Sequence, residues 1–418
     1  MGDSWIRDPG LAPSGRDKIQ WVWRNMPVMR QIAGEFAAAK PFAGMRILVC
    51  LHLEAKTACL GLTLREGGAT VTMTASNPLS TQDDVCAAMV ADGLRVFALH
   101  GATPEEYSQC HRRALEDGLP ELFVDDGGDI TALLHKSYRQ QLSGVLGGSE
   151  ETTTGIQRLK AMEKDGTLQI PMLAVNDARM KYLFDNRYGT GQSAWDAIMN
   201  ATNLVIAGKT AVVVGYGWCG KGVAMRARGL GARVIVTEVD PVKAIEAWMD
   251  GFQVMTMAEA APLGDYFITV TGVNSVINGA HMAKMRDGAI LANAGHFDAE
   301  ISKPDLAAWG AGPKRVKPHI DAYESKDGRR LYLIGEGRLV NLAAGNGHPA
   351  EVMDTSFAAQ ALAMLYLREN QGSLPKKVIP VPAALDERIA RIKLAAANIG
   401  VDSLTAEQKA YQESWVIA

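Results

Sequence analysis

Three glycines in the middle of the chain, Gly215, Gly217 and Gly220, have the spacing G-x-G-x-x-G. They follow a β-branched apolar run and open a helix-like segment, the context in which this spacing binds a dinucleotide. The first glycine permits a tight turn, the second lets the backbone approach a pyrophosphate, and the third packs helix on strand. Glu238 follows about 20 residues later, where a carboxylate accepts hydrogen bonds from the ribose hydroxyls of NAD. The sequence predicts NAD, although nearby Lys243 could soften the preference over NADP.

Lys181 and Asp185 form a second candidate group, because they stand four residues apart. On a helix this spacing places both side chains on one face. A lysine beside a carboxylate in a desolvated cleft can carry a proton, and Asn186 would complete the polar cluster. Solvated surface ion pairs have the same spacing, so the pair alone does not define a site.

His52, Asp126 and His296 each stand at the end of an apolar run. Parallel strands present binding residues at such ends, and histidine transfers protons near neutral pH. A histidine at this position is also often structural, and Asp126 could instead cap a helix. The sequence leaves open which of the three groups would perform which transfer.

The elements that must position these residues alternate between short apolar runs and helix-like segments. Runs at 45–53, 69–75, 94–99 and 121–129 form one series, and a second series begins at Gly208. This alternation predicts parallel sheets with helices on both faces. We expect an α/β fold with two Rossmann-like, doubly wound parallel-sheet domains joined by a hinge, plus a small helical C-terminal segment.

Three longer helical stretches stand outside this alternation. Helices are expected over Trp21–Ala39 and Val352–Glu369, and a helical connection over Met180–Ala201, interrupted near Tyr188–Gly191.

Composition excludes several classes of function. At 418 residues the chain is long enough for two or three domains, and a net charge of −3 gives no electrostatic basis for a nucleic-acid or membrane partner. No apolar run approaches the roughly 18 residues of a membrane span, and the N-terminus lacks a signal peptide. The five cysteines lack zinc-binding spacing. We expect a cytoplasmic enzyme with a small-molecule substrate and no metal site.

Several longer blocks are distinctive in sequence and order. They are SNPLSTQDDV, DDGGD, SEETTTG, VNDARMKYLFDNRYGTGQS, NAGHFDAEI and EGRLVNLAAGNGHP. With these blocks the chain resembles the S-adenosylhomocysteine hydrolase family, the adenosylhomocysteinases, from about Trp21 to about Tyr411.

The resemblance implies a reversible hydrolysis of S-adenosyl-L-homocysteine to adenosine and L-homocysteine, a reaction of one-carbon metabolism. In that reaction the ribose 3′-OH is oxidised, the 4′ proton is abstracted, homocysteine is eliminated, water adds, and the ketone is reduced again. It also implies one tightly bound NAD per subunit and a homotetramer.

The resemblance also assigns domains. Residues 1–184 would bind the substrate, with 348–378 returning to this domain. Residues 185–347 would bind NAD, and 379–418 would form a helical oligomerisation segment.

The resemblance assigns roles residue by residue. Catalytic residues would be His52, Asp126, Glu151, Lys181, Asp185, Asn186 and His296. Cofactor-binding residues would be Thr152, Thr153, Thr154, Asn186, Gly215, Gly217, Trp218, Cys219, Gly220, Glu238, Lys243, Thr271, Gly295 and Asn341. Substrate-binding residues would be His52, Glu54, Lys56, Thr57, Asp126, Glu151, Lys181, Asp185, His296, Gly347, His348, Met353 and Phe357. The glycines of 345–347 would permit the backbone rotation that closes the cleft.

One departure from the family pattern concerns the purine. Many members read L-H-M-T-x-[E/Q]-T, whereas this chain reads LHLEAKT, with Glu54 and Lys56. Residues 52, 54 and 56 would share a side if the segment were extended. A carboxylate matches the N6 donor of adenine, and an ammonium matches the O6 acceptor of hypoxanthine. Glu54 could therefore hold adenine with Lys56 as its ion partner, or Lys56 could indicate S-inosyl-L-homocysteine or relaxed purine specificity.

Two further departures concern the cofactor side. Many members carry a K-P-D-H-Y-R-Y tail that reaches a neighbouring subunit's NAD, whereas this chain ends in YQESWVIA, a short form. Weaker NAD retention or a different cross-subunit contact is expected. Thr190 stands where many members have cysteine.

Two other functions share part of this pattern. An NAD-dependent 2-hydroxy acid dehydrogenase would have the glycine turn, but not DDGGD or SEETTTG. A non-catalytic NAD-binding regulator would be expected to lack some of the polar groups that this chain retains.

Overall fold

The computed structural model describes residues 4–415. Strand β1 (Arg46–Leu51) is buried from Ile47 onward, because helices cover both faces of a parallel sheet. It belongs to a sheet of parallel strands in the order β15 (Val378–Pro380), β6 (Met172–Ala174), β5 (Gly147–Glu150), β4 (Leu122–Asp125), β1, β2 (Thr70–Ala75) and β3 (Arg95–Phe97).

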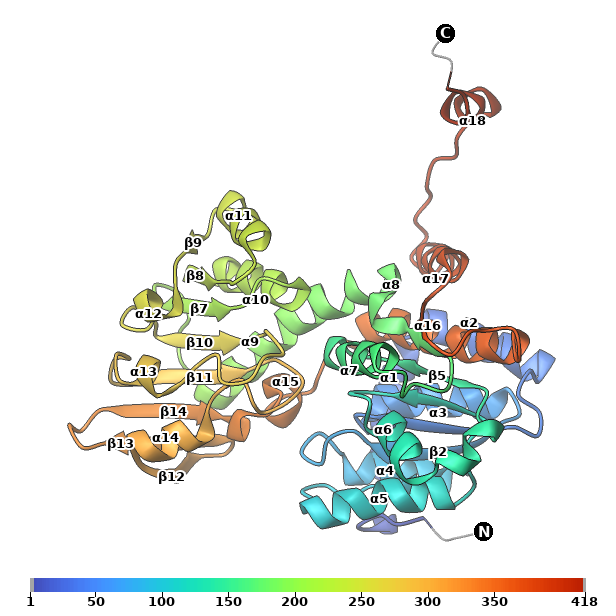
Figure 1. The fold of residues 1–418 in the computed structure, drawn as a ribbon, viewed down its shortest axis with the longest axis horizontal. Helices are drawn as coiled ribbons and strands as arrows, with labels where there is room; N and C mark the ends of the chain where they lie inside the picture. Colours follow the sequence, from blue (N-terminus) through green and yellow to red (C-terminus); the bar gives the residue numbers. More distant parts are fainter. Residues whose placement is uncertain (1–3, 416–418) are drawn as a thin grey trace.

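A second sheet lies in a separate body of the molecule (Figure 1). Its order is β12 (Gly310–Lys317), β13 (Ile320–Ser325), β14 (Arg330–Ile334), β11 (Ala289–Asn293), β10 (Tyr266–Thr269), β7 (Thr210–Val214), β8 (Arg233–Thr237) and β9 (Gln253–Val254). Strand β13 pairs antiparallel with both β12 and β14, and the other pairings are parallel. Two α/β bodies with doubly wound sheets confirm the predicted fold class; the antiparallel edge was not predicted.

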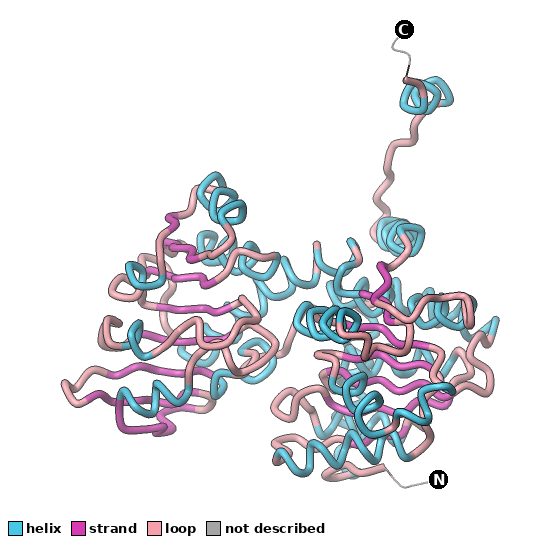
Figure 2. Tube along the Cα trace, in the orientation of Figure 1, coloured by secondary structure: helices cyan, strands magenta, loops and turns pink. Residues whose placement is uncertain are grey.

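Helices surround both sheets, as the tube in Figure 2 shows. Those of the first body are α1 (Ala12–Arg24), α2 (Pro27–Ala39), α3 (Ala55–Glu66), α4 (Asp83–Ala91), α5 (Pro104–Glu116), α6 (Asp129–Ser137), α7 (Thr153–Lys164), α16 (Ala350–Glu369) and α17 (Ala383–Ala396). Those of the second are α10 (Trp218–Gly229), α11 (Pro241–Met249), α12 (Met257–Ala260), α13 (Gly279–Met282), α14 (Lys303–Trp309) and α15 (Val340–Ala343).

Short 3-10 turns and a C-terminal helix complete the chain. The turns cover Pro9–Leu11, Arg139–Gly144, Val175–Asp177 and Gly335–Gly337. Helix α18 (Ala406–Glu413) buries none of its residues and projects away from both bodies (Figure 1).

The segment between the two bodies differs from its prediction. Helix α8 (Arg179–Tyr182) is followed by a π-helix at Asp185–Gly189 and then by α9 (Thr190–Thr202). The interruption thus begins near Leu183, earlier than the predicted Tyr188–Gly191. The single helix predicted over Trp21–Ala39 is also wrong, because Pro27 stands at the first turn of α2 and the chain breaks before it.

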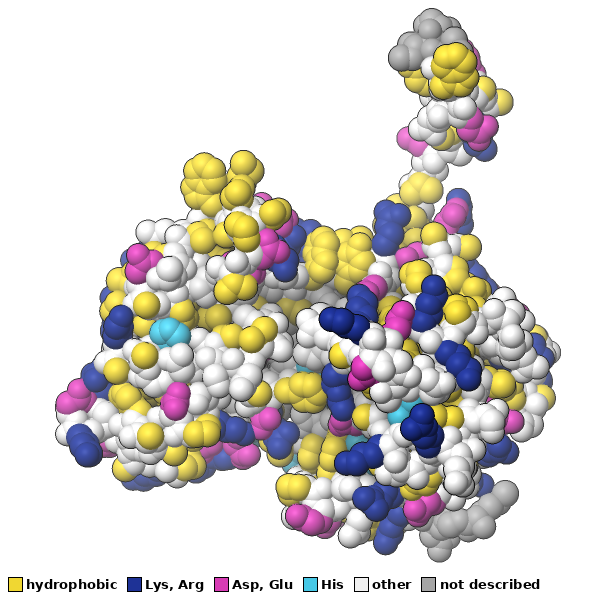
Figure 3. Space-filling model, viewed as in Figure 1, with side chains coloured by type: hydrophobic (Ala, Val, Ile, Leu, Met, Phe, Trp, Pro, Cys, Tyr) yellow, Lys and Arg dark blue, Asp and Glu magenta, His cyan; other side chains and the backbone are white. Residues whose placement is uncertain are grey.

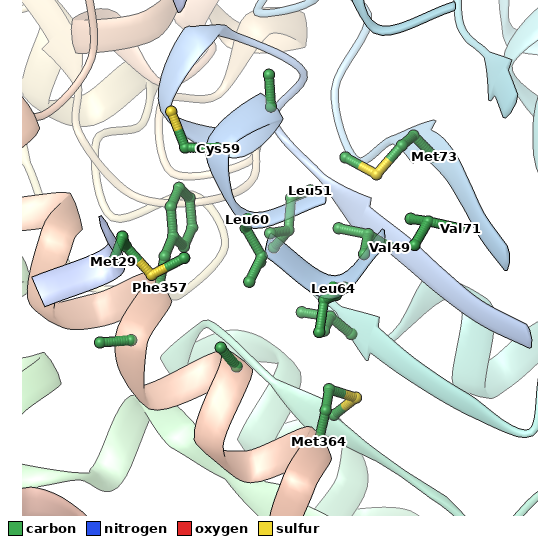
Figure 4. Close-up of a cluster of buried hydrophobic side chains, with 14 of the residues drawn as sticks. Met29, Val49, Leu51, Cys59, Leu60, Leu64, Val71, Met73, Phe357 and Met364 are labelled. Atoms are coloured by element: carbon green, nitrogen blue, oxygen red, sulfur yellow. The ribbon is translucent and has the colours of Figure 1, made fainter. Parts of the chain in front are cut away.

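Helix α16 joins the C-terminal part of the chain to the first body. Its Phe357 and Met364 belong to one buried apolar cluster with Leu60 and Leu64 of α3 and Val49 of β1 (Figure 4). Burying one such side chain contributes about 1.5–3 kcal/mol to the free energy of folding. Residues far apart in sequence therefore hold α16 against the first sheet.

Each sheet reverses its strand order at one point. The reversal lies between β1 and β4 in the first sheet and between β7 and β10 in the second. Ligands of open parallel sheets bind outside the carboxyl ends of the strands at such points. His52 and Asp126 follow β1 and β4, and Gly215 and Thr271 follow β7 and β10.

Within residues 4–415, no helix combines the length and the hydropathy needed to cross a membrane.

Candidate active site

A cavity of about 1050 Å³ is lined by residues of both bodies. Its walls contain every predicted site residue except Gly220 and Gly347. Gly220 serves packing instead, because a Cβ there would lie 2.1 Å from the Gly215 carbonyl oxygen. Gly347 has a φ of +70° and lies over Leu342, whose Cδ2 would be 2.7 Å from an added Cβ.

The glycine turn has the geometry of a dinucleotide cradle. Gly215 adopts a φ of +107°, which favours glycine. An added Cβ on Gly217 would meet no heavy atom of residues 4–415 within 4 Å, so the backbone is open to a ligand there. Helix α10 begins at Trp218, and no side chain in the described part of the chain caps its first N–H groups, which suits an anionic phosphate.

Two buried atoms in this half of the cavity have no partner among the described residues. They are the Thr154 Oγ1 and the Asn341 Oδ1. The Asn341 Nδ2 donates to the Ser193 hydroxyl at 3.0 Å, which fixes the amide with its oxygen unpaired. A buried unpaired polar group costs about 1–3 kcal/mol, and a nicotinamide carboxamide offers the missing donor. These residues therefore fit NAD.

Glu238 stands directly after β8, as predicted. Its Oε2 accepts from the Tyr216 N–H at 2.7 Å, and its Oε1 accepts from the Val239 N–H at 2.7 Å. Oε1 also accepts from the Asp240 N–H at 3.1 Å, whereas Oε2 keeps a lone pair for a ribose hydroxyl. Lys243 is paired with Asp240 at 3.5 Å, so its ammonium is already partly neutralised.

Glu300 is a site residue that the sequence did not indicate. Its two oxygens accept from the Thr271 N–H at 2.8 Å and from the Gly272 N–H at 2.8 Å. It thus fixes the loop after β10 that lines the cofactor half of the cavity. Only the fold brings Glu300 to that loop.

Lys181 is the centre of a buried polar cluster. Its Nζ lies 3.3 Å from Asp185 Oδ1 and 3.5 Å from Glu151 Oε1, and it donates to Asn186 Oδ1 at 2.8 Å. Because α8 ends at Tyr182, the pair meets across the start of the π-helix rather than on one regular α-helix. Asn176, which was not predicted, accepts from Lys181 at 3.4 Å and donates to Thr153 at 3.1 Å.

The pKa values of this cluster follow from its burial and charges. Burial opposes the Lys181 ammonium, but the Asp185 and Glu151 carboxylates outweigh it and raise the lysine pKa. Burial likewise opposes the Asp185 carboxylate, yet Lys181 and His348 lower its pKa. Burial raises the pKa of Glu151 to about 8, with Lys181 offsetting part of the effect. Glu151 is thus the carboxyl group of the cluster that can exchange a proton near neutral pH.

Helix α16 supplies two partners that the sequence analysis missed. Ser356 donates to Asp185 Oδ2 at 2.8 Å, and the Gln360 amide donates to Glu151 Oε2. These residues are four apart on a helix that is otherwise mostly apolar and buried. Such a polar stripe on a core helix is a signal that could have identified them.

His52, Asp126 and His296 come together as predicted from their strand ends. The His52 Nε2 lies 3.3 Å from Asp126 Oδ2, and the His296 Nδ1 lies 3.6 Å from Asp126 Oδ1. Burial lowers the pKa of His52 to about 4, although Asp126 opposes the shift. At neutral pH the His52 imidazole is therefore neutral, with one ring nitrogen carrying a proton and the other a lone pair.

The alternative that Asp126 caps a helix is wrong. Asp125 has that role, accepting from the N–H groups of Ile130 at 3.3 Å and Thr131 at 2.8 Å. One potential ligand atom each from His52, Asp126 and His296 lies within 4.8 Å of the other two.

The LHLEAKT segment is not extended as the sequence analysis assumed. Strand β1 ends at Leu51, and Glu54 caps α3 by accepting from the Lys56 N–H at 3.0 Å. Glu54 and Lys56 nevertheless both line the cavity, with the Lys56 Nζ 2.8 Å from Glu54 Oε2. Thr57 donates to the His52 carbonyl oxygen.

His348 connects the two halves of the cavity. Its Nδ1 lies 3.1 Å from Asp185 Oδ1, and its Nε2 lies 3.3 Å from the Thr190 hydroxyl. Thr190 also donates to the Cys219 sulfur at 3.6 Å. Met353 and Phe357 of α16 provide an apolar wall nearby.

Comparison with known proteins accounts for this arrangement. Residues 3–145 match the family model described as S-adenosyl-L-homocysteine hydrolase, and residues 186–347 match the model of its NAD binding domain. The chain is 56% identical over 413 residues to an adenosylhomocysteinase of Pyrococcus abyssi, covering 99% of this chain and 98% of the relative. An adenosylhomocysteinase of Thermococcus kodakarensis is 57% identical with the same coverage. An S-inosyl-L-homocysteine hydrolase of Methanocaldococcus jannaschii is 55% identical over 410 residues, 98% of each chain. The chain therefore belongs to the S-adenosyl-L-homocysteine hydrolase family of enzymes, and its cofactor is NAD.

Proposed function

We propose that this enzyme hydrolyses S-adenosyl-L-homocysteine reversibly to adenosine and L-homocysteine. The observation that carries the proposal is that the Lys181 cluster and the His52–Asp126–His296 group line the same cavity as the dinucleotide cradle. A plain dehydrogenase needs only one proton-transfer group beside its cofactor, whereas elimination of a thioether needs a second. The adenosylhomocysteinase names of its relatives support the same reaction.

The Lys181 cluster is proposed to act at the ribose 3′ position. Bound NAD supplies the reversible oxidation there. The hydroxyl proton passes into the cluster, where Glu151 has a pKa of about 8. Lys181 and Asn186 hold the 3′ oxygen, and Asp185 keeps the lysine protonated and oriented. A reversible step needs a proton carrier whose pKa lies near the working pH.

The second group is proposed to act at C4′ and C5′. A 3′ ketone acidifies the 4′ proton, and the neutral His52 or Asp126 removes it as the C5′–S bond breaks. The departing sulfur takes a proton from the same group, leaving an enone and homocysteine. Water then adds at C5′ and C4′ regains its proton, so the net change is hydrolysis.

Glu54 and Lys56 are proposed to contact the purine edge. Lys56 already has two partners, Glu54 at 2.8 Å and the Asn346 carbonyl oxygen at 3.0 Å. Its charge is therefore largely satisfied, which favours Glu54 as the acceptor for the N6 group of adenine. The alternative, S-inosyl-L-homocysteine, is supported by the printed activity of the Methanocaldococcus jannaschii relative.

The test compares kcat/KM for the adenosyl and inosyl substrates without added NAD. Release of adenosine and homocysteine with NAD still bound supports the main proposal. Turnover of the inosyl substrate alone supports the alternative, and stoichiometric consumption of added NAD without thioether cleavage contradicts both.

Domain roles are proposed as the resemblance implies. Residues 1–184, with 348–378, bind the substrate, and 185–347 bind NAD. The position of α16 beside the first sheet supports the return of the chain to that domain. The free cysteines of the described chain suit a cytoplasmic enzyme.

A homotetramer with one tightly bound NAD per subunit is also proposed, with 379–418 in the subunit contacts. Two exposed apolar surfaces support it: α11 with Val242, Ile245, Trp248 and Met249 (Figure 3), and the C-terminal arm with Leu404, Tyr411 and Trp415. The final residues 416–418 lie outside the described structure.

Light scattering of Trp248→Ser combined with Met249→Ser tests this assembly. We expect a smaller oligomer and faster loss of NAD during dialysis. Trp21→Ser, another exposed tryptophan, is the matched control. An unchanged oligomer in the double variant would contradict a role for α11.

A further inference from the structure

Helix α8 carries Lys181 but is only one turn long, over Arg179–Tyr182. The first N–H groups of a helix have no partner within it, so those of Arg179 and Met180 need acceptors from outside. The preceding residue, Ala178, has an extended backbone but no side chain that could accept a hydrogen bond. The start of α8 therefore depends on an acceptor from another part of the chain.

Asp386, in the first turn of α17, provides that acceptor. Its Oδ2 accepts from the Arg179 N–H at 2.9 Å, and its Oδ1 accepts from the Met180 N–H at 2.8 Å. Hydrogen bonds to a charged carboxylate are stronger than neutral ones, and a bidentate pair adds geometric specificity. The two bonds thus fix both the position and the rotation of the helix start.

Helix α17 is itself fixed to the first body, beside α8 (Figure 1). Its Ile389 is fully buried and belongs to the same apolar cluster as Met180. Its Lys393 donates to Asp354 Oδ2 of α16 at 3.0 Å. Because α17 is anchored in this way, Asp386 is a fixed support for α8.

We propose that Asp386 is a positioning residue for Lys181, because it holds the start of the helix that carries the lysine. The lysine Nζ lies 3.3 Å from Asp185, 3.5 Å from Glu151 and 2.8 Å from Asn186. A shift of α8 by about 1 Å would disturb all three contacts, and a misplacement of that size can reduce a rate about 100-fold. The inference rests on the proposed role of this cluster at the ribose 3′ position.

The position of Asp386 also has a consequence for assembly. It belongs to residues 379–418, the segment proposed for subunit contacts. That segment and the Lys181 cluster therefore meet through one carboxylate.

Asp386→Ala tests the positioning role. We expect kcat for S-adenosyl-L-homocysteine to fall about 10–100-fold, with KM and NAD content unchanged. Adenosine should reduce the bound NAD more slowly by the same factor, as followed by the near-ultraviolet absorbance of NADH. The matched control is Glu387→Ala, which removes the next carboxylate of α17, an exposed one paired with Arg391. It should behave like the unaltered enzyme.

Two further variants restore an acceptor. Asp386→Asn keeps one accepting oxygen, and asparagine caps helices about as well as aspartate. Ala178→Ser, combined with Asp386→Ala, places a hydroxyl at the N-cap of α8, where it can accept from the Met180 N–H. Each should recover part of the lost rate. Failure of both to do so would show that the N–H contacts are not the cause.

The pH profile separates positioning from a loss of stability. Burial raises the pKa of Glu151 to about 8, and Lys181 offsets part of that shift. With the lysine displaced, the Glu151 pKa should be higher, so the kcat–pH profile of Asp386→Ala should move to higher pH. A lowered Tm with an unmoved profile and an unchanged kcat would overturn the proposal.

Amide hydrogen exchange tests the contact without relying on activity. The N–H groups of Arg179 and Met180 should exchange faster in Asp386→Ala than in Glu387→Ala, and equal rates would overturn the contact. If the unaltered enzyme hydrolyses neither thioether and adenosine does not reduce its NAD, the proposed function fails. Faster exchange would then still identify Asp386 as the support of α8.

Discussion

Lys56 donates a hydrogen bond across 3.0 Å to the backbone carbonyl oxygen of Asn346, which is 290 residues later in the chain. The contact joins the first turn of α3 to the glycine-rich stretch 345–347, beside the cavity. It links the proposed purine-binding edge to the segment proposed to close the cleft. The same ammonium is paired with Glu54 at 2.8 Å.

Lys56→Met should therefore change purine preference. Without the ammonium, the O6 of hypoxanthine loses its proposed donor, while Glu54 still accepts from adenine N6. An unpaired buried polar group costs about 1–3 kcal/mol, so kcat/KM for the inosyl substrate should fall about 10–100-fold relative to the adenosyl substrate. Lys160→Met, at an exposed lysine paired with Asp177, is the control. An unchanged ratio would show that Lys56 does not contact the base.

Lys181→Met should abolish most turnover while NAD remains bound. Lys181 does not belong to the glycine turn, but it orients Asp185, Glu151 and Asn186 around the proposed 3′ oxygen. General acid–base groups contribute about 10²–10⁴-fold in rate, and a fall in kcat of that size is expected. Thioether cleavage at the original rate in the folded, NAD-loaded variant would refute the mechanism.

Alanine at two glycines of the turn should have different effects. Gly220→Ala places a Cβ 2.1 Å from a backbone oxygen, so the variant should lose thermal stability. Gly217→Ala meets no atom of the described protein within 4 Å, so it should fold normally and bind NAD at least about tenfold more weakly, because the methyl group occupies the pyrophosphate approach. The checks are the apparent Tm and the NAD content. Equal NAD content in Gly217→Ala and the unaltered enzyme would argue against this cradle.

His52 should make stability depend on pH between about 6.5 and 4. Burial lowers its folded pKa to about 4, so in this range the unfolded chain binds a proton that the folded chain does not. Stability is therefore lost as pH falls, by up to about 3 kcal/mol at the lower end. Between pH 7 and pH 4.5, the Tm of His52→Gln should fall less than the Tm of the unaltered enzyme. His319→Gln should behave like the unaltered enzyme, and an identical decline in His52→Gln would contradict the depressed pKa.

The amino-acid sequence by itself determined the fold class and most of the cavity wall. Glycine spacing and strand-end position depend on local backbone geometry, which is why Gly215, Glu238, His52 and Asp126 could be placed in advance. The tertiary structure decided which residues far apart in the sequence come into contact. Glu300, Ser356 and Gln360 reach the site only because a loop or a core helix packs beside it, and such packing has no signature in local periodicity.

The tertiary structure also decided local backbone geometry that residue spacing predicted wrongly. Glu54 caps a helix instead of lying on a strand, and Lys181 meets Asp185 across a π-helix. At both places the backbone hydrogen bonds depend on the surrounding contacts. The local conformation therefore differs from the regular strand or α-helix that the sequence analysis assumed.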